Sequence, residues 1–269
     1  MRCALDLLEF IDFHLPDLER DQVRHNLIIG LLSSTRDRQD QDLMFWTLGP
    51  PGACAIKTPG RAIVLGELND LQCHRLAEET VELDYPGVLG PDQSALLFKT
   101  RAEELGLRFE GPIEQGISAL TEPPVYPDVP GGVPRRVTAD DADRFADWIV
   151  KFVKKVSPHD PLPSEELLRS RAGAGQHWFW TVYGEPVSLA GIVRQTRAAA
   201  AIASVYTAPS HRNQGFAGAV VSMVVDQIYA GGRKTACLYT NLANPISNRC
   251  YEKIGFKQVG TASLQMRVG

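Results

Sequence analysis

Cysteine is scarce in this sequence and has no regular spacing. Five cysteines occur in 269 residues, and no two of them have the CxxC spacing of a zinc site or a redox-active pair. An odd, scattered set excludes a disulfide framework and a structural zinc domain. We therefore expect a protein of a reducing compartment, the cytoplasm, with no bound metal. The cysteines are Cys3, Cys54, Cys73, Cys237 and Cys250.

Long hydrophobic runs and an excess of positive charge are also absent. No apolar run approaches the roughly 20 residues that a membrane-spanning helix needs, and the acidic Asp6 follows the first residue too closely for a signal peptide. The formal net charge is −4, so no basic stripe is available for a nucleic-acid backbone. We expect neither a membrane nor a nucleic acid as partner.

A segment rich in proline and glycine divides the chain. Between Thr121 and Pro134, proline removes backbone donors and glycine adds backbone freedom, so neither a helix nor a strand ladder is expected. We predict a first domain over residues 1–120, a linker over 121–133 and a second domain over 134–269. The length of the chain agrees with about two domains.

The first domain has a mixed pattern without a cluster of catalytic residues. Spacing of the apolar residues predicts helices and short strands in alternation. His14, His25 and His74 are isolated, and we interpret them as surface or packing residues. The predicted helices are Leu5–Phe13, Leu18–Leu32, Asp70–Leu83 and Asp92–Glu104, and the predicted strands are Leu43–Leu48, Ala53–Thr58 and Ala62–Leu65.

The second domain alternates strands and helices more regularly. Thr138 and Ser164 are predicted N-caps of helices, and Gly184-Glu185-Pro186 is the predicted turn of a hairpin. This order implies an α/β or α+β domain with a central sheet. The predicted strands are Pro134–Val137, His177–Tyr183, Val187–Val193, Ala198–Tyr206, Thr235–Thr240 and closing strands within Phe256–Val268; the later helices are Gln214–Ala230 and Asn244–Ile254.

One strand-to-helix turn carries a candidate phosphate site. An apolar strand ends at Tyr206, the chain turns through Pro209, and a helix opens behind Arg212-x-x-Gly215-x-Ala217. The first turn of a helix has unsatisfied amides and a partial positive charge, and small residues let a pyrophosphate approach the backbone. Arg212 can add a charge-assisted hydrogen bond to a phosphate oxygen.

A second motif begins at Asn244 and ends at Phe256. Asn244 followed by Pro245 is a favourable helix start. Tyr251 lies about two turns further along, where a phenol with a pKa near 10 can protonate a thiolate whose thiol has a pKa near 8.5. A purely structural interpretation is also open, with Asn244 as an N-cap and Tyr251 as a packing aromatic.

Together these motifs resemble the GNAT superfamily of acyl-CoA N-acyltransferases. Arg212–Ala217 is similar to its cofactor loop, and Asn244–Phe256, with Ser247 at the small-residue position, is similar to its N-x-x-[A/S]-x-x-x-Y-x-K-x-G-F helix. Arg24–Leu32 and Pro86–Pro91 resemble the first half of a two-domain branch. The resemblance implies an α/β (α+β) fold of two tandem GNAT-like domains, each a mixed, mostly antiparallel central sheet flanked by helices, the first a degenerate copy without the loop.

The resemblance also implies roles for particular residues. Acetyl-CoA is the expected co-substrate: its pantetheine would lie along the strand end, its pyrophosphate on the loop amides, and its thioester sulfur facing Tyr251. The residues expected to bind the cofactor are Val205, Tyr206, Thr207, Arg212, Asn213, Gln214, Gly215, Phe216, Ala217, Asn244 and Asn248.

The predicted activity is transfer of an acetyl group from acetyl-CoA to a primary amine of a small molecule or peptide, by direct attack in a ternary complex. Many relatives place a carboxylate on the strand before the loop, but Ala198–Tyr206 has none, so no general base is assigned. One alternative is a non-catalytic acyl-CoA-binding sensor or interaction module. A dinucleotide-dependent oxidoreductase is a remote alternative, because the required GxGxxG is absent.

Overall fold

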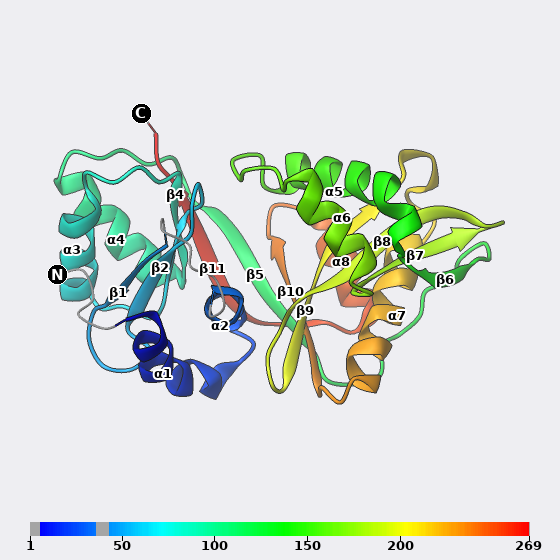
Figure 1. Cartoon of the computed structure of the whole chain (residues 1–269), viewed down its shortest axis with the longest axis horizontal. Helices are drawn as coiled ribbons and strands as arrows, with labels where there is room; N and C mark the ends of the chain where they lie inside the picture. Colours follow the sequence, from blue (N-terminus) through cyan, green and yellow to red (C-terminus); the bar gives the residue numbers. More distant parts are fainter. Residues whose placement is uncertain (1–5, 36–42, 269) are drawn as a thin grey trace. The chain divides into compact units, whose positions relative to one another are not determined.

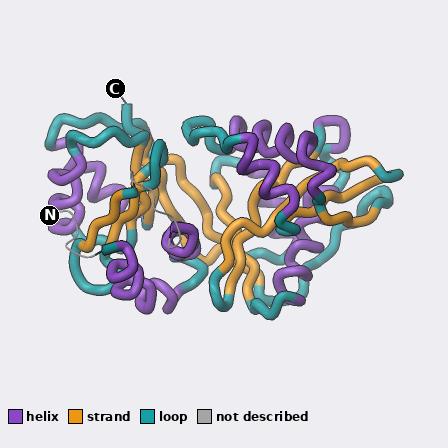
Figure 2. The backbone as a smooth tube through the Cα atoms, in the orientation of Figure 1, coloured by secondary structure: helices purple, strands orange, loops and turns teal. Residues whose placement is uncertain are grey.

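The computed structural model describes residues 6–35 and 43–268, which form two compact units (Figure 1). Unit 1 comprises Met1–Ile117, Asn241–Ala243 and Val259–Gly269, and unit 2 comprises Ser118–Thr240 and Asn244–Gln258. Each unit has a mixed, mostly antiparallel sheet, and Figure 2 shows helices flanking the strands. The predicted fold class is therefore confirmed.

The sheet of unit 1 has the strand order β1-β2-β3-β4-β11. Neighbouring strands are antiparallel except β3 and β4, which are parallel and joined by helix α3. The elements of unit 1 are α1 (Leu7–Leu18), η1 (Glu19–Asp21), α2 (Asn26–Thr35), β1 (Met44–Thr47), β2 (Cys54–Lys57), β3 (Ile63–Leu65), α3 (Asp70–Thr80), β4 (Gly87–Gly90), α4 (Asp92–Glu104) and most of β11 (Lys257–Met266).

This division differs from the predicted domain boundaries at the end of the chain. The sequence assigned 134–269 to the second domain, whereas Val259–Gly269 belongs to unit 1. The physical reason is a ladder in which Ser263–Met266 pairs antiparallel with Gly87–Gly90. Strand β5 (Ile113–Leu120) spans the boundary between the two units.

The prediction of one helix over Leu18–Leu32 is wrong. The described chain leaves α1 at Leu18, makes the short 3-10 turn η1, and begins α2 only at Asn26. Polar side chains favour the break, since the Asp21 carboxylate accepts the Arg24 N–H at 3.0 Å and the His25 ring bonds the Leu18 carbonyl at 2.9 Å. The earlier helix, predicted from Leu5, is α1; Leu5 itself lies outside the described residues.

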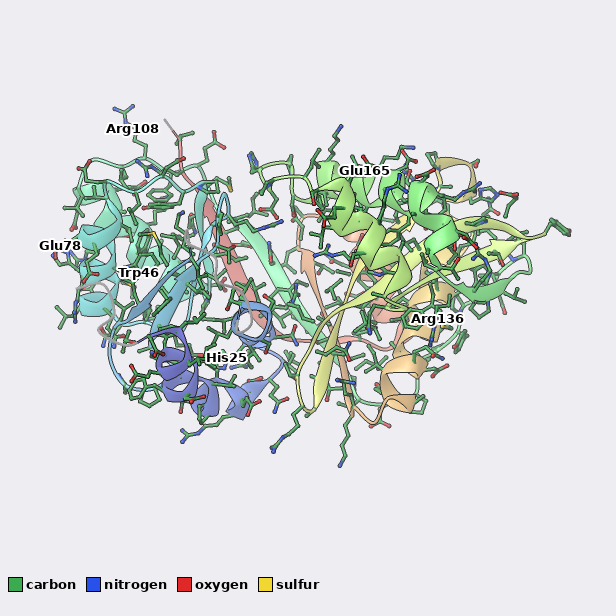
Figure 3. All side chains as sticks on the ribbon, viewed as in Figure 1. His25, Trp46, Glu78, Arg108, Arg136 and Glu165 are labelled. Carbon is green, nitrogen blue, oxygen red and sulfur yellow. The ribbon has the colours of Figure 1, made fainter. Side chains whose placement is uncertain are left out.

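His14 is a buried packing residue of unit 1. Its ring is fully buried beside Phe10, with the ring centroids 4.6 Å apart. The Gly52 N–H donates to Nδ1 at 3.1 Å, so Nε2 carries the proton and donates to Thr47 Oγ1 at 3.0 Å. Trp46, labelled in Figure 3, is buried in the neighbouring core of the same unit. Burial lowers the pKa of His14 to about 4.

We expect the neutral His14 to make unit 1 sensitive to acid. In the unfolded chain the imidazole takes up a proton below about pH 6.5, whereas in the folded chain it does so only near pH 4. The unfolded state therefore binds more protons between these values, and the free energy of unfolding falls by about 2 kcal/mol from pH 7 to pH 5. Urea unfolding at both pH values measures the loss. His14→Asn keeps an acceptor for Gly52 without a titrating ring, so an unchanged pH dependence in this variant would contradict the assignment.

The sheet of unit 2 has the strand order β10-β9-β8-β7-β6 and repeats the plan of unit 1. Its single parallel pair, β9 and β10, is again joined by a helix. The elements are β6 (Val133–Arg136), η2 (Ala139–Asp141), α5 (Ala142–Val156), α6 (Glu165–Gly173), β7 (His177–Val182), β8 (Glu185–Gln195), β9 (Ala199–Thr207), η3 (Pro209–His211), α7 (Phe216–Ala230), β10 (Thr235–Asn241) and α8 (Pro245–Ile254).

Two apolar layers hold the helices of unit 2 on its sheet. Helix α7 is buried along most of its length, through residues such as Phe216 and Val220. Helices α5 and α6 pack through a separate cluster that includes Phe145 and Trp148. The α7 layer holds α7 against β8 and β9, with the N-terminal end of α7 near the end of β9.

The hairpin between β7 and β8 turns one residue earlier than predicted. Strand β8 already begins at Glu185, so the turn is Tyr183-Gly184 and not Gly184-Glu185-Pro186. Both turn residues have positive φ angles, 49° and 84°, as the two-residue turns that match strand twist require. Tyr183 is fully exposed there.

The predicted linker is an ordered strap, residues 121–131, that lies along α7 within unit 2. The carbonyl of Val125 accepts a hydrogen bond from the Ser222 hydroxyl at 3.0 Å. The Tyr126 hydroxyl donates to the Asp226 carboxylate at 2.5 Å. Proline and glycine thus prevent regular structure in this segment without preventing order.

The described cysteines are unpaired, and the described helices are short. Cys54, Cys73, Cys237 and Cys250 are free thiols, and Cys3 lies outside the described residues. No helix in the described part of the chain has both the length and the apolar character to cross a bilayer.

Candidate functional site

Strands β9 and β10 separate toward their carboxyl ends. Their parallel register runs from Ala199↔Thr235 to Ala201↔Cys237. Beyond that point β9 continues to Thr207 and β10 to Asn241, with no further pairing between them. Residues Val205–Thr207 of β9 therefore have no ladder partner on β10, while the opposite edge pairs with β8 up to Ser188↔Thr207.

A bulge in β9 accompanies this separation. The register with β8 shifts between Gly191↔Ala203 and Leu189↔Tyr206. Ser204, inside the bulge, has a φ of 59°, which is unusual for a residue with a side chain. A bulge bends its strand and increases the local twist, so this feature turns the end of β9 away from β10. Tyr206 then packs on Trp148, with the ring centroids 5.2 Å apart.

The turn after β9 leads into α7, whose first backbone N–H groups have no partner within the helix. Asn213 and Gly215 both have left-handed backbones, with φ angles of 60° and 84°. Gly215 is the N-cap, and no side chain caps the helix. The first intrahelical bond is donated by Ala219 to the Gly215 carbonyl, so the amides of Phe216, Ala217 and Gly218 precede the helical ladder. This end can bind an anion.

In unit 1, the helix that corresponds to α7 is α3, and its first turn is capped by side chains. Helix α3 also connects two parallel strands, but Asn69 and Gln72 form a capping box at its start. The Asn69 side chain accepts the Gln72 N–H at 3.0 Å, and the Gln72 side chain accepts the Asn69 N–H at 2.9 Å. Of the two crossover helices, α3 has a side-chain cap and α7 has none.

Two polar side chains of the turn donate hydrogen bonds to backbone carbonyls near the turn. Arg212 Nε donates to the Thr207 carbonyl at 3.2 Å, and Gln214 Nε2 donates to the Ser210 carbonyl at 3.3 Å. Arg212 is exposed and forms no ion pair with a described carboxylate. Its terminal guanidinium nitrogens can therefore donate hydrogen bonds to an anion bound at the turn.

Helix α8 begins with the predicted cap. Asn244 is the N-cap, its side-chain oxygen accepting the Ser247 N–H at 3.2 Å, and Pro245 follows at the first helical position. Asn248 is half-buried one turn further along, and its N–H bonds the Asn244 carbonyl at 3.1 Å. The structural interpretation of Asn244 is correct, and a contact of Asn244 or Asn248 with a cofactor stays a prediction.

Tyr251 lies on α8 against the core cluster that contains α7. Its ring stands edge-on to Phe256, with the centroids 6.1 Å apart. The hydroxyl makes no hydrogen bond to a described residue, and it is not among the fully buried polar atoms. Burial of the side chain raises the pKa of Tyr251 above its ordinary value of 10. The phenol is therefore a proton donor without a partner of its own.

One part of the site was not found from the sequence. A Cβ on Gly215 would come 2.8 Å from the Asp128 carbonyl and 3.1 Å from Val129 Cγ1, so the strap passes directly beside the start of α7. A Cβ on Gly218, in the first turn of α7, would come 3.0 Å from Pro127 Cγ. Packing against the strap is therefore one cause of the small residues at this turn, and no local sequence signal indicates it.

Comparisons with known proteins agree with this geometry. Residues 182–265 match the family model described as FR47-like protein. No curated protein matches the chain. A Drosophila protein of known X-ray structure superposes with a TM-score of 0.69 at 16% identity, covering 98% of this chain and 97% of that one.

Two bacterial structures give similar values. A GCN5-related N-acetyltransferase from Kribbella flavida has a TM-score of 0.63 at 17% identity, with coverage of 92% and 95%. Another from Sphaerobacter thermophilus has a TM-score of 0.60 at 17% identity, with coverage of 89% and 85%. The likeness spans both units, and at these identities it concerns the fold. The resemblance seen in the sequence is confirmed at the level of the fold: this chain is a two-unit protein with the fold of the GNAT superfamily, and the FR47-like region extends from the end of β7 into β11.

Proposed function

We propose that the protein transfers an acetyl group from acetyl-CoA to a primary amine. The observation that carries this proposal is the uncapped start of α7 beside the end of β9 that has no ladder partner on β10. A diphosphate fits the amides of Phe216–Gly218, and the amide chain of a pantetheine arm fits the backbone of Val205–Thr207. The acceptor is a small-molecule amine or a peptide amine.

The chain's own groups would act as follows. The loop amides and Arg212 hold the diphosphate, and the edge of β9 orients the thioester. A neutral substrate amine attacks the thioester carbonyl, the new C–N bond forms, and the C–S bond breaks. Tyr251 gives its proton to the departing sulfur, the amine's surplus proton passes to solvent, and the tyrosinate takes up a proton from solvent before the next turnover.

A non-catalytic acyl-CoA-binding module is the second candidate. The observation that favours it is the composition of β9, where Ala199–Thr207 contains no carboxylate to accept a proton from the amine. The free phenol of Tyr251 favours the enzyme, since a sensor has no need for a proton donor at that place.

Release of free coenzyme A distinguishes the two candidates. The full-length protein is mixed with acetyl-CoA and a panel of small amines and peptides, and thiol release is followed by a colorimetric reagent. An enzyme gives amine-dependent, multiple-turnover release together with an acetylated product in the mass spectrum. Saturable binding of acetyl-CoA without turnover would favour the sensor. Absence of both binding and turnover would refute the acyl-CoA assignment.

A further inference from the structure

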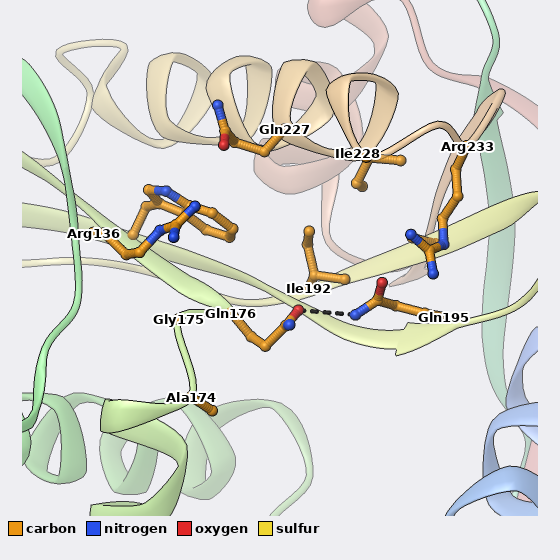
Figure 4. Close-up of a pocket in the computed structure, with 12 residues that line it drawn as sticks. Arg136, Ala174, Gly175, Gln176, Ile192, Gln195, Gln227, Ile228 and Arg233 are labelled. Atoms are coloured by element: carbon orange, nitrogen blue, oxygen red, sulfur yellow. Dashed lines mark hydrogen bonds between the residues drawn. The ribbon is translucent and has the colours of Figure 1, made fainter.

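Unit 2 has an open surface cavity of about 280 Å³ at the carboxyl end of α7, with Arg136 and Gln195 exposed at its rim. It lies between the last turn of that helix and strands β7 to β9 (Figure 4). Helix α7 has 15 residues, so this end is about 22 Å from the uncapped start at Gly215. The cavity is therefore separate from the candidate cofactor loop, and nothing in the proposed reaction uses it.

The charges around the cavity have one sign. Among its twelve lining residues are Arg136 and Arg233 and no aspartate or glutamate, although the whole chain has a net charge of −4. Figure 4 shows the two arginines on opposite sides of the cavity. Two separated guanidinium groups without carboxylates between them favour a ligand with two negative groups.

Each of the two arginines has a contact with a ring or a backbone carbonyl, and neither has its charge paired with a carboxylate. The Arg136 guanidinium lies 5.3 Å from the centroid of the Trp178 ring. Arg233 Nε donates to the Thr196 carbonyl at 3.1 Å. Neither forms an ion pair with any carboxylate in the described part of the chain, in contrast with Arg101 and Arg135, which bind carboxylates at 2.6 and 2.7 Å.

The rest of the lining supplies neutral donors and apolar surface. Gln195 Nε2 donates to Gln176 Oε1 at 2.9 Å, which leaves the amide nitrogen of Gln176 as a donor (Figure 4). Gln227 adds a further carboxamide from α7. Ile192 and Ile228 form an apolar part of the wall. This combination suits a short aliphatic chain between two anionic ends.

We propose that this cavity is a binding site for a small dicarboxylate. One carboxylate binds the edge of the Arg136 guanidinium, and the other binds Arg233, with the connecting methylene groups against Ile192 and Ile228. The site does not depend on acyl transfer, since it shares none of its residues with the α7 loop.

Isothermal titration of the full-length protein with glutarate tests the proposal. Glutarate is expected to bind saturably, with butyrate, which has one carboxylate, at least tenfold weaker. Arg136→Gln and Arg233→Gln are each expected to weaken glutarate binding by about tenfold or more, because each removes a charge-assisted contact. Arg233→Lys, which keeps the charge, should lose less affinity than Arg233→Gln.

Two controls make the result specific. Lys234→Gln removes the exposed charge that follows Arg233 in the chain but does not line the cavity, and it should leave glutarate binding unchanged. An equal loss would show general charge attraction and overturn the proposal. Inorganic phosphate is the second probe. Tighter binding of phosphate than of glutarate would overturn the dicarboxylate assignment, as would absence of saturable glutarate binding in protein whose thermal unfolding is normal.

Discussion

Ala217→Asp is expected to weaken acetyl-CoA binding by about 10- to 100-fold while the protein stays folded. Ala217 is half-buried in the first turn of α7, next to the amides assigned to the diphosphate. A carboxylate there repels a diphosphate, by an energy of a few kcal/mol at close range before screening. The same carboxylate interacts favourably with the positive end of the helix, which contributes about 0.3–1 kcal/mol to stability. Binding and stability should therefore move in opposite directions.

The matched control for this variant is Ala217→Asn, which has nearly the same shape without the charge. Calorimetric titration with acetyl-CoA at low and high salt measures both, and thermal unfolding verifies the fold. An aspartate variant that binds acetyl-CoA as well as the wild type would contradict the phosphate assignment. Gly215 is less suitable for this test, because its φ of 84° and the nearby Asp128 carbonyl make any side chain there disruptive.

Tyr251→Phe is expected to reduce kcat by about 100-fold or more and to leave the KM for acetyl-CoA nearly unchanged. General-acid catalysis contributes on the order of 10²–10⁴-fold. The hydroxyl has no described hydrogen-bond partner, whereas the ring packs against Phe256, so phenylalanine should preserve the fold. The raised pKa of Tyr251 keeps the phenol protonated up to at least pH 10. Its deprotonation should therefore not limit turnover below that pH.

Steady-state kinetics with any accepted amine gives the split between kcat and KM. Tyr229→Phe is the matched control, since it removes a hydroxyl that bonds the Leu120 carbonyl at 2.7 Å, at the other end of α7. That variant should lose some stability and keep its turnover. Full kcat in Tyr251→Phe would remove the phenol from the mechanism.

Most helix ends of unit 2 could be predicted because their causes are local. Asn244 and Pro245 start α8 with their own side chains and backbone, and Gly231 ends α7 where expected. The strand-turn-helix around Arg212 was likewise predictable, because an apolar strand, a proline and small residues follow one another in the sequence. The break at Asp21–His25 was missed, since apolar spacing continues through it while polar side chains turn the chain.

Features that join distant segments were not predictable in this way. The pairing of Ser263–Met266 with Gly87–Gly90 depends on strands far apart in the chain. The course of the strap beside Gly215 depends on contacts between residues about 90 positions apart, and its proline-rich composition indicates only that it is neither helix nor strand. Arg136 and Arg233 line one cavity although each is unremarkable in its own sequence context.

The sequence by itself determined where most helices of unit 2 end, which residues are small or polar at the turn after β9, and which phenol follows on α8. These properties depend on backbone conformation and on neighbours within a few residues. Only the tertiary structure decided that β9 bends away from β10 at Ser204, that α3 has a side-chain cap while α7 has none, and that two arginines face one cavity. Each of these depends on which surfaces pack together, and packing of distant segments leaves no periodic trace in the chain.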